Sequence, residues 1–159
     1  ELVAQGQTGP EARLKARHIV LPELPKPVGN YVEAVRVGNL LYLSGHGPDD
    51  SWRGKGQVGR EVSLDQGRAA ARSAGLRMLS TIRGTLGSLD KVERVVKIFG
   101  MVNSAPGFAE QPKVIDGFSD LMTEVFGDVA GKGTRSAVGM SALPFGIPVE
   151  VELILEVRD

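Results

Sequence analysis

The segment from residue 149 to 157 constrains the fold most, because its side chains alternate in polarity along nearly its whole length. Period-two alternation is the pattern of a β-strand with one face buried and the other exposed. One face would carry Val149, Val151, Leu153, Leu155 and Val157, and the other Glu150, Glu152 and Glu156. Such a strand needs a sheet around it and a layer of apolar side chains against one face of that sheet.

Two segments have the apolar spacing of amphipathic helices that could supply this layer. The first opens with a capping-box pattern, Ser63 with Gln66, and we expect it to end near Gly84 or Gly87. The second begins at Pro112 and closes at Gly127. Apolar or small residues at spacings of mostly three and four mark one face of each, namely Ala71, Gly75, Met78, Ile82 and Leu86, then Val114, Phe118, Leu121 and Val125.

Four further runs have strand composition. We predict a β-hairpin from Tyr31–Val37 and Leu40–Ser44, joined by Gly38-Asn39, and later strands at Val92–Val102 and Thr134–Leu143. The order is therefore two strands, helix, strand, helix, two strands. It predicts an α+β fold with two main helices on one face of a mixed sheet.

The chain's 159 residues fit one domain spanning 1–159. Residues 1–24 form an N-terminal extension with a short helix between Pro10 and His18, and a proline-rich connector over 21–27 should be extended. The glycine-rich stretch Gly45–Arg60 is typical of a surface loop.

Composition excludes several function classes. Nineteen basic residues balance nineteen acidic ones, so the basic excess of nucleic-acid binders is missing. There is no cysteine, and His18 and His46 lack metal-ligand spacing, so we expect no metal. No apolar stretch is long enough to span a bilayer. We therefore expect a cytoplasmic protein that binds neither nucleic acid nor membrane.

Arg135 is the candidate binding residue that the strand pattern singles out. Alternation places it on one face with Ala137, Gly139 and Ser141, whose small side chains would leave open space above the sheet. A guanidinium beside such a space can hold a carboxylate through two parallel hydrogen bonds. The alternative is a surface arginine paired with a neighbouring acid. For the glutamates of 149–157, the alternative is a solvated face.

The two terminal strands also predict a geometry. If they form an antiparallel hairpin turning near Phe145-Gly146, Arg135 lies opposite Glu156 and Glu150 opposite Ser141. Arg135 and Glu150 would then be about 20 Å apart along the strands, at about 3.3 Å per residue. We expect them to serve one site only if they come from different subunits.

Short motifs in order along the chain resemble the Rid/YjgF family from about Lys26 onward. They are Gly29-Asn30-Tyr31, Gly38 to His46 (GNLLYLSGH), Thr134 to Val138 (TRSAV), Leu143-Pro144 and Val149 to Glu152 (VEVE). The resemblance implies a chorismate-mutase-like fold and a homotrimer with ligand sites in clefts between subunits. It also implies hydrolysis of small imine or enamine carboxylates, such as 2-aminoacrylate, to a 2-keto acid and ammonia without a cofactor.

The same resemblance assigns roles to single residues. Arg135 would bind the carboxylate of the metabolite, and Glu150 would position or activate water. Tyr31, Ser44 and Gly45 would line the cleft. Ala137 and Asp116 stand at or near substrate-side positions where better-known members carry other residues, so the substrate side departs from the family.

Two other functions stay open. The chain could be a non-catalytic trimeric binder of small carboxylates. An endoribonuclease or translation inhibitor is the third reading, against which the neutral charge and the absence of a histidine pair both argue.

Overall fold

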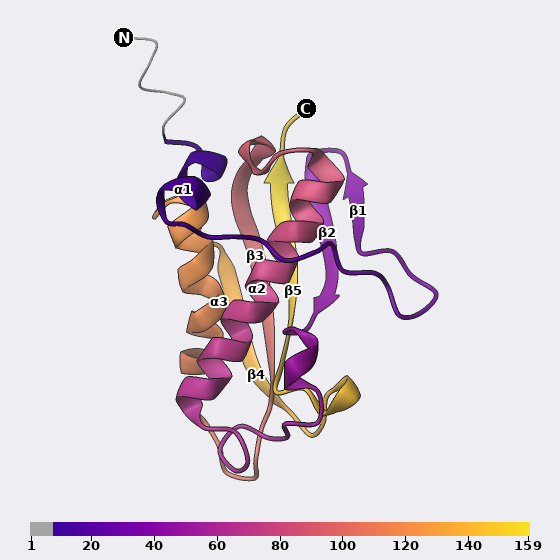
Figure 1. Cartoon of the computed structure of the whole chain (residues 1–159), viewed down its shortest axis with the longest axis vertical. Helices are drawn as coiled ribbons and strands as arrows, with labels where there is room; N and C mark the ends of the chain where they lie inside the picture. Colours follow the sequence, from indigo (N-terminus) through magenta and orange to yellow (C-terminus); the bar gives the residue numbers. More distant parts are fainter. Residues whose placement is uncertain (1–7) are drawn as a thin grey trace.

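The computed structural model describes residues 8–159, so the first seven residues of the N-terminal extension lie outside the described part. Five strands form one sheet in the order β1-β2-β5-β3-β4, and helices cover one face of it (Figure 1). The strands are β1 (Ala34–Val37), β2 (Leu40–His46), β3 (Val92–Asn103), β4 (Thr134–Met140) and β5 (Val149–Val157). The helices are α1 (Pro10–Ala16), α2 (Leu64–Leu86) and α3 (Gln111–Phe126).

The sheet is mixed, as predicted. β1 and β2 form an antiparallel hairpin whose turn is Gly38-Asn39, with Gly38 in the left-handed region at φ 58°. β5 runs antiparallel to both of its neighbours, β2 and β3. β3 and β4 are parallel. The alternation in β5 is confirmed, because all five of its predicted apolar residues are buried.

α2 and α3 pack against the same sheet face, and their apolar stripes form the core. The capping box of α2 is present, with Ser63 accepting from the Gln66 amide and Gln66 accepting from the Ser63 amide. α2 ends at Leu86, followed by Gly87 in the left-handed conformation. The fold class is therefore α+β with helices on one face of a mixed sheet, as the sequence predicted.

The predicted hairpin of the last two strands is wrong. β3 lies between β4 and β5, and β4 pairs with β3 in parallel. Residues 141–148, which include the short 3-10 helix η4 (Pro144–Gly146), carry the chain from β4 past β3 to β5. Arg135 consequently pairs with Ile98 rather than Glu156, and Glu150 pairs with Met101 rather than Ser141.

The N-terminal segment is fastened along α2. Glu11 in α1 accepts two hydrogen bonds from Arg83 and one from the Leu89 amide, and the Ser80 hydroxyl donates to the Pro22 carbonyl. The predicted short helix is present as α1, and the proline-rich residues 21–27 form neither helix nor strand. The connector leads to Pro25 and Lys26, which line a pocket described below.

None of the helices within residues 8–159 combines the length and the apolar character that crossing a membrane requires.

Candidate functional site

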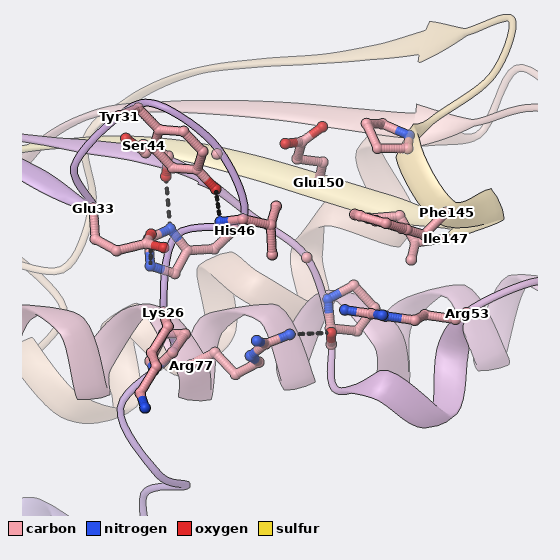
Figure 2. A pocket seen from close by; sticks show the side chains of 16 residues that line it. Lys26, Tyr31, Glu33, Ser44, His46, Arg53, Arg77, Phe145, Ile147 and Glu150 are labelled. Atoms are coloured by element: carbon pink, nitrogen blue, oxygen red, sulfur yellow. Dashed lines mark hydrogen bonds and ion pairs between the residues drawn. The ribbon is translucent and has the colours of Figure 1, made fainter.

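A depression of about 370 Å³ lies beside the carboxyl end of β2. We call it the Glu150 pocket (Figure 2). It brings together four of the predicted site residues, namely Tyr31, Ser44, Gly45 and Glu150. Its other lining residues are Pro25, Lys26, Val28, Glu33, His46, Gly47, Pro48, Arg53, Arg77, Pro144, Phe145 and Ile147.

A β-bulge in β2 shapes this pocket. Leu43 pairs with Leu153 and His46 with Val151, so Ser44 and Gly45 together oppose the single residue Glu152. The extra residue breaks the alternation of β2, which turns the His46 side chain into the protein interior. The segment 45–47, predicted as the start of a surface loop, is therefore part of the strand end and of the pocket wall.

Glu150 projects from the sheet face that β5 does not bury in the core. In Figure 2 its carboxyl group lies on the other side of the strands from the helix that carries Arg77. A side chain at Gly45 would overlap with the Glu150 carboxyl group, so any larger residue here would have to displace that group. Within residues 8–159 the carboxyl group has no hydrogen-bond or ion-pair partner. Burial, and then the negative charge of Glu152, raise the pKa of Glu150.

His46 is buried, and both of its ring nitrogens are occupied. Nδ1 lies 2.6 Å from the Ser44 carbonyl oxygen, and Nε2 lies 2.8 Å from the Thr81 hydroxyl and 3.3 Å from a Glu33 carboxylate oxygen. Burial lowers the pKa of His46 and the Arg77 charge lowers it further, whereas the Ser44 carbonyl and Glu33 oppose the shift. The ring is therefore held neutral near pH 7, with the Nδ1 proton on the Ser44 carbonyl.

Tyr31 and Ser44 are tied to the same rim of the pocket. The Ser44 hydroxyl donates to the Val32 carbonyl at 2.6 Å, and the Ser44 amide donates to the Glu33 carbonyl at 2.9 Å. The Tyr31 hydroxyl accepts a bond from the Val28 amide at 3.3 Å. Its own hydrogen has no acceptor among the described residues, so it is free to donate to a ligand.

The opposite rim is aromatic and cationic. Phe145 has φ 59°, a left-handed conformation that is rare for an aromatic residue, and its ring is half exposed. The Arg53 guanidinium stacks on that ring at 4.5 Å and pairs with Asp50 at 3.3 Å. Sequence reasoning missed this rim, because neither the left-handed backbone at Phe145 nor the stacking leaves a local pattern.

Arg135 lies elsewhere, in a second depression of about 270 Å³ that we call the Arg135 cleft. Its guanidinium donates to Asp116 at 2.7 Å, to the Ser119 hydroxyl at 3.2 Å and to the Pro112 carbonyl at 3.4 Å. All three belong to α3. The lining residues of the cleft are Ile98, Asp116, Ser119, Asp120, Thr123, Gly131, Lys132, Gly133 and Arg135.

The open space predicted above β4 is not there. α3 covers that face, Ala137 packs against the core, and the place of a Gly139 side chain is taken by Gln111 and Ser104. The alternative for Arg135, pairing with a neighbouring acid, is the one found, because Asp116 neutralises it. Asp116 is thus placed with Arg135, whereas Ala137 lines neither depression.

Arg135 and Glu150 are separated within one chain. Arg135 is level with Leu153 of β5 through Ile98, which leaves three residues along β5 and two strand spacings between them. This corresponds to about 14 Å between α-carbons, from about 3.3 Å per residue and 4.8 Å per strand. The two side chains also point to opposite sheet faces, because Arg135 contacts α3 whereas Glu150 alternates with the buried Val149 and Val151.

No metal site accompanies these groups in the described residues, where no three histidine, aspartate or glutamate side chains converge. The two depressions therefore offer organic groups only: a half-buried carboxyl, hydroxyls and a buried imidazole in one, and an acid-paired guanidinium in the other.

Comparison with known proteins places this arrangement in a family. The model of the YjgF/chorismate mutase-like family, whose description also names an endoribonuclease, matches residues 11–156. The chain belongs to the Rid/YjgF family. This Rid/YjgF chain is 41% identical to Protein TCP17 of Trypanosoma cruzi, over 99% of each. It is 30% identical to a 2-iminobutanoate/2-iminopropanoate deaminase of Dermatophagoides farinae, over 89% of this chain and 97% of that one.

A solved structure resembles the Rid/YjgF chain over nearly its full length. The protein Atu1372 of Agrobacterium tumefaciens, described as having unknown function, matches with a TM-score of 0.83 and 39% identity. The match covers 98% of this chain and 97% of that one, so it includes most of the N-terminal segment fastened along α2.

Proposed function

We propose that the chain is a cofactor-independent deaminase that hydrolyses small imine or enamine carboxylates to a 2-keto acid and ammonia. The observation that carries the proposal is the Glu150 carboxyl group, half-buried and without a partner among residues 8–159, at the edge of the pocket that also holds Tyr31 and Ser44. A carboxyl group with a raised pKa in a pocket is typical of general acid–base catalysis. A relative named as an imine deaminase supports the choice of reaction.

The chemistry needs one proton-transfer group. Ionised Glu150 takes a proton from water as the water oxygen bonds to the imine carbon. The protonated carboxyl then gives this proton to the nitrogen, which yields a carbinolamine. The carboxylate next takes the proton of the new hydroxyl group and passes it to the amino nitrogen; as the carbonyl double bond forms, the carbon–nitrogen bond breaks and ammonia leaves with the 2-keto acid. An enamine substrate first gains a proton at carbon to become the imine. Because the imine is already electrophilic, orientation of water and substrate supplies most of the acceleration.

Arg135 would bind the substrate carboxylate from a neighbouring subunit of a homotrimer. The 14 Å separation and the opposite orientation of Arg135 and Glu150 prevent one chain from placing both around a small substrate. Arg135 keeps donor capacity for a ligand, because its Nε–H has no partner within residues 8–159. We further propose that the trimer is a cytoplasmic protein, with the whole chain as one domain.

The first experiment measures 2-keto acid and ammonia release from 2-aminoacrylate generated enzymatically in the assay. Glu150→Gln should remove most of the activity. Glu156→Gln is the matched control, since it lies on the same strand face. Arg135→Ala should lose about 2–5 kcal/mol of transition-state stabilisation, and Arg135→Lys should also be impaired because a point charge lacks the planar fork. Full activity in a folded Arg135→Ala protein would refute the assignment.

The second experiment tests whether sites are shared between subunits. Inactive Arg135→Ala and Glu150→Gln proteins are mixed in equal amounts under subunit exchange. If each site takes its arginine from one subunit and its glutamate from another, random assembly restores about a quarter of wild-type activity. Sites built within one chain would regain none.

A non-catalytic binder of small carboxylates is the second candidate. The Nε–H of Arg135, which has no partner within residues 8–159, supports this candidate, because a free guanidinium donor can bind a carboxylate without any reacting group nearby. Carboxylate binding without 2-keto acid release in the first experiment would support this candidate over the deaminase.

A further inference from the structure

His46 occupies a position where an apolar residue would suffice for packing. Its side chain is only 2% exposed, and burial of a polar ring is costly unless its nitrogens are bonded. Both nitrogens are bonded here, to the Ser44 carbonyl and the Thr81 hydroxyl, and Ser44 lines the Glu150 pocket together with Glu33, whose carboxylate lies near Nε2. The imidazole therefore connects the pocket wall to the core rather than filling a gap.

The Nδ1 bond fixes the orientation of one peptide plane. A carbonyl oxygen can only accept, so Nδ1 carries the proton and donates it to Ser44 at 2.6 Å. The Ser44 carbonyl and the Gly45 α-carbon lie in the same planar peptide unit. Holding the carbonyl consequently holds Gly45, and Gly45 is the residue packed against the Glu150 carboxyl group.

The contacts of Nε2 hold the ring itself in place. The neutral ring accepts a bond from the Thr81 hydroxyl of α2 at 2.8 Å. The charged groups that face the ring are Glu33, from the segment before β1, and Arg77, from α2. Arg77 is itself anchored by donating to the Pro48 carbonyl at 2.6 Å, and both residues line the pocket (Figure 2).

We propose that His46 is a positioning residue for Glu150: its Nδ1–H holds the Ser44–Gly45 bulge that confines the Glu150 carboxyl group. The connection runs from the Thr81 hydroxyl through the imidazole and the Ser44 carbonyl to Gly45. His46 touches neither the substrate nor the reacting atoms. The kinetic part of this inference rests on the proposed deaminase function.

Two isosteric substitutions separate the roles of the two nitrogens. In His46→Asn the side-chain amide lies where Nδ1 lies, so it keeps the donor to Ser44 but cannot reach Glu33 or Thr81. In His46→Gln the amide lies where Nε2 lies, so the bond to Ser44 is lost. His46→Asn should keep kcat within about threefold of wild type, whereas His46→Gln should lose about tenfold, the effect of one positioning hydrogen bond.

The second measurement needs no turnover. Titration of the Glu150 carboxyl carbon by NMR should give the same raised pKa in wild type and His46→Asn. In His46→Gln that pKa should fall towards its ordinary value, because a released bulge admits water. His18→Asn is the matched control, since His18 is exposed with φ 54°, a conformation that asparagine tolerates.

The Nε2 bond is tested by a double-mutant cycle. Thr81→Val should shift the Glu150 titration in the wild-type background and have no effect in His46→Asn, whose side chain does not reach residue 81. Equal behaviour of the asparagine and glutamine variants in both measurements would overturn the proposal. If wild type hydrolyses no imine, the deaminase function fails, while the Glu150 titration still decides whether His46 positions the bulge.

Discussion

Arg135 and Glu150 lie on opposite faces of one sheet, two strands apart, and each is placed by a different layer of the fold. Arg135 is held by α3 through Asp116, Ser119 and Pro112, whereas Glu150 is confined by the bulge of β2. A site that uses both residues must therefore combine two surfaces, the Arg135 cleft and the Glu150 pocket. Variants that alter one surface should leave the other intact.

Removing the charge of Asp116 should strengthen carboxylate binding. Asp116 neutralises Arg135 at 2.7 Å, so it competes with any anionic ligand for the guanidinium. We expect Asp116→Asn to lower KM for a carboxylate substrate about two- to fivefold, the range of a partly exposed ion pair. Asp120→Asn is the control, because Asp120 lines the same cleft but pairs with Arg68. An unchanged or higher KM in Asp116→Asn would show that Asp116 orients Arg135 instead of competing.

Removing the charge of Glu152 should move the acid limb of activity to lower pH. Glu152 raises the pKa of Glu150, and the proposed reaction needs ionised Glu150. Activity should therefore rise with pH through the raised pKa of Glu150, and Glu152→Gln should shift that rise downwards. The measurement is kcat/KM against pH for both proteins. If the two profiles of kcat/KM against pH coincided, a group other than Glu150 would set the acid limb of activity.

Neutralising Glu150 should stabilise the folded protein at neutral pH. A carboxyl group whose folded-state pKa is raised favours folding at pH below its unfolded-state pKa, and that contribution is lost as pH rises through the folded-state pKa. Glu150→Gln should therefore unfold at higher denaturant concentration than wild type at pH 7, with the difference shrinking towards pH 4. Equal midpoints at pH 7 would contradict the burial of the ionised group.

A methyl group at Gly100 should disrupt the packing of α3 on the sheet. An added Cβ would lie 2.5–2.7 Å from three side-chain carbons of Ile115. We expect Gly100→Ala to reduce the free energy of unfolding by about 1–3 kcal/mol, measured by denaturant titration. Ile115→Val removes one of the three carbons, so the double mutant should recover part of the loss. If the effects of the two substitutions on the free energy of unfolding simply added, α3 would shift as a whole instead of clashing at Ile115.

Local patterns predicted most of the elements. The capping box at Ser63, the Gly38-Asn39 turn and the alternation of β5 each depend on neighbours within a few residues, and each is found. The pairing of β4 is not local. Consecutive strands usually pair, but residues 141–148 are long enough to pass β3, so β4 joins the outer edge of the sheet instead.

The candidate site, like the fold, could be predicted from the sequence only in part. Tyr31, Ser44, Gly45 and Glu150, which the family resemblance suggested as site residues, line one pocket, whereas Arg135 lies in another. The contact between Glu33 and His46 escaped prediction because the bulge reverses which side of β2 faces inwards after Leu43. An odd run of glycine and polar residues at the end of an alternating strand, Ser44-Gly45-His46-Gly47, is the signal that could have indicated it.

Because of the bulge, the number of residues in this part of β2 matters as much as their types. With Ser44 and Gly45 both present, His46 faces the interior while the strand before it keeps its own register. Deleting either residue would leave one residue opposite Glu152 and restore simple pairing, with His46 still facing inwards opposite Val151. The bulge that carries Gly45 against the Glu150 carboxyl group would be lost with it. Length changes at this strand end should therefore be far less tolerated than at the Gly38-Asn39 turn, where the chain can lengthen into solvent.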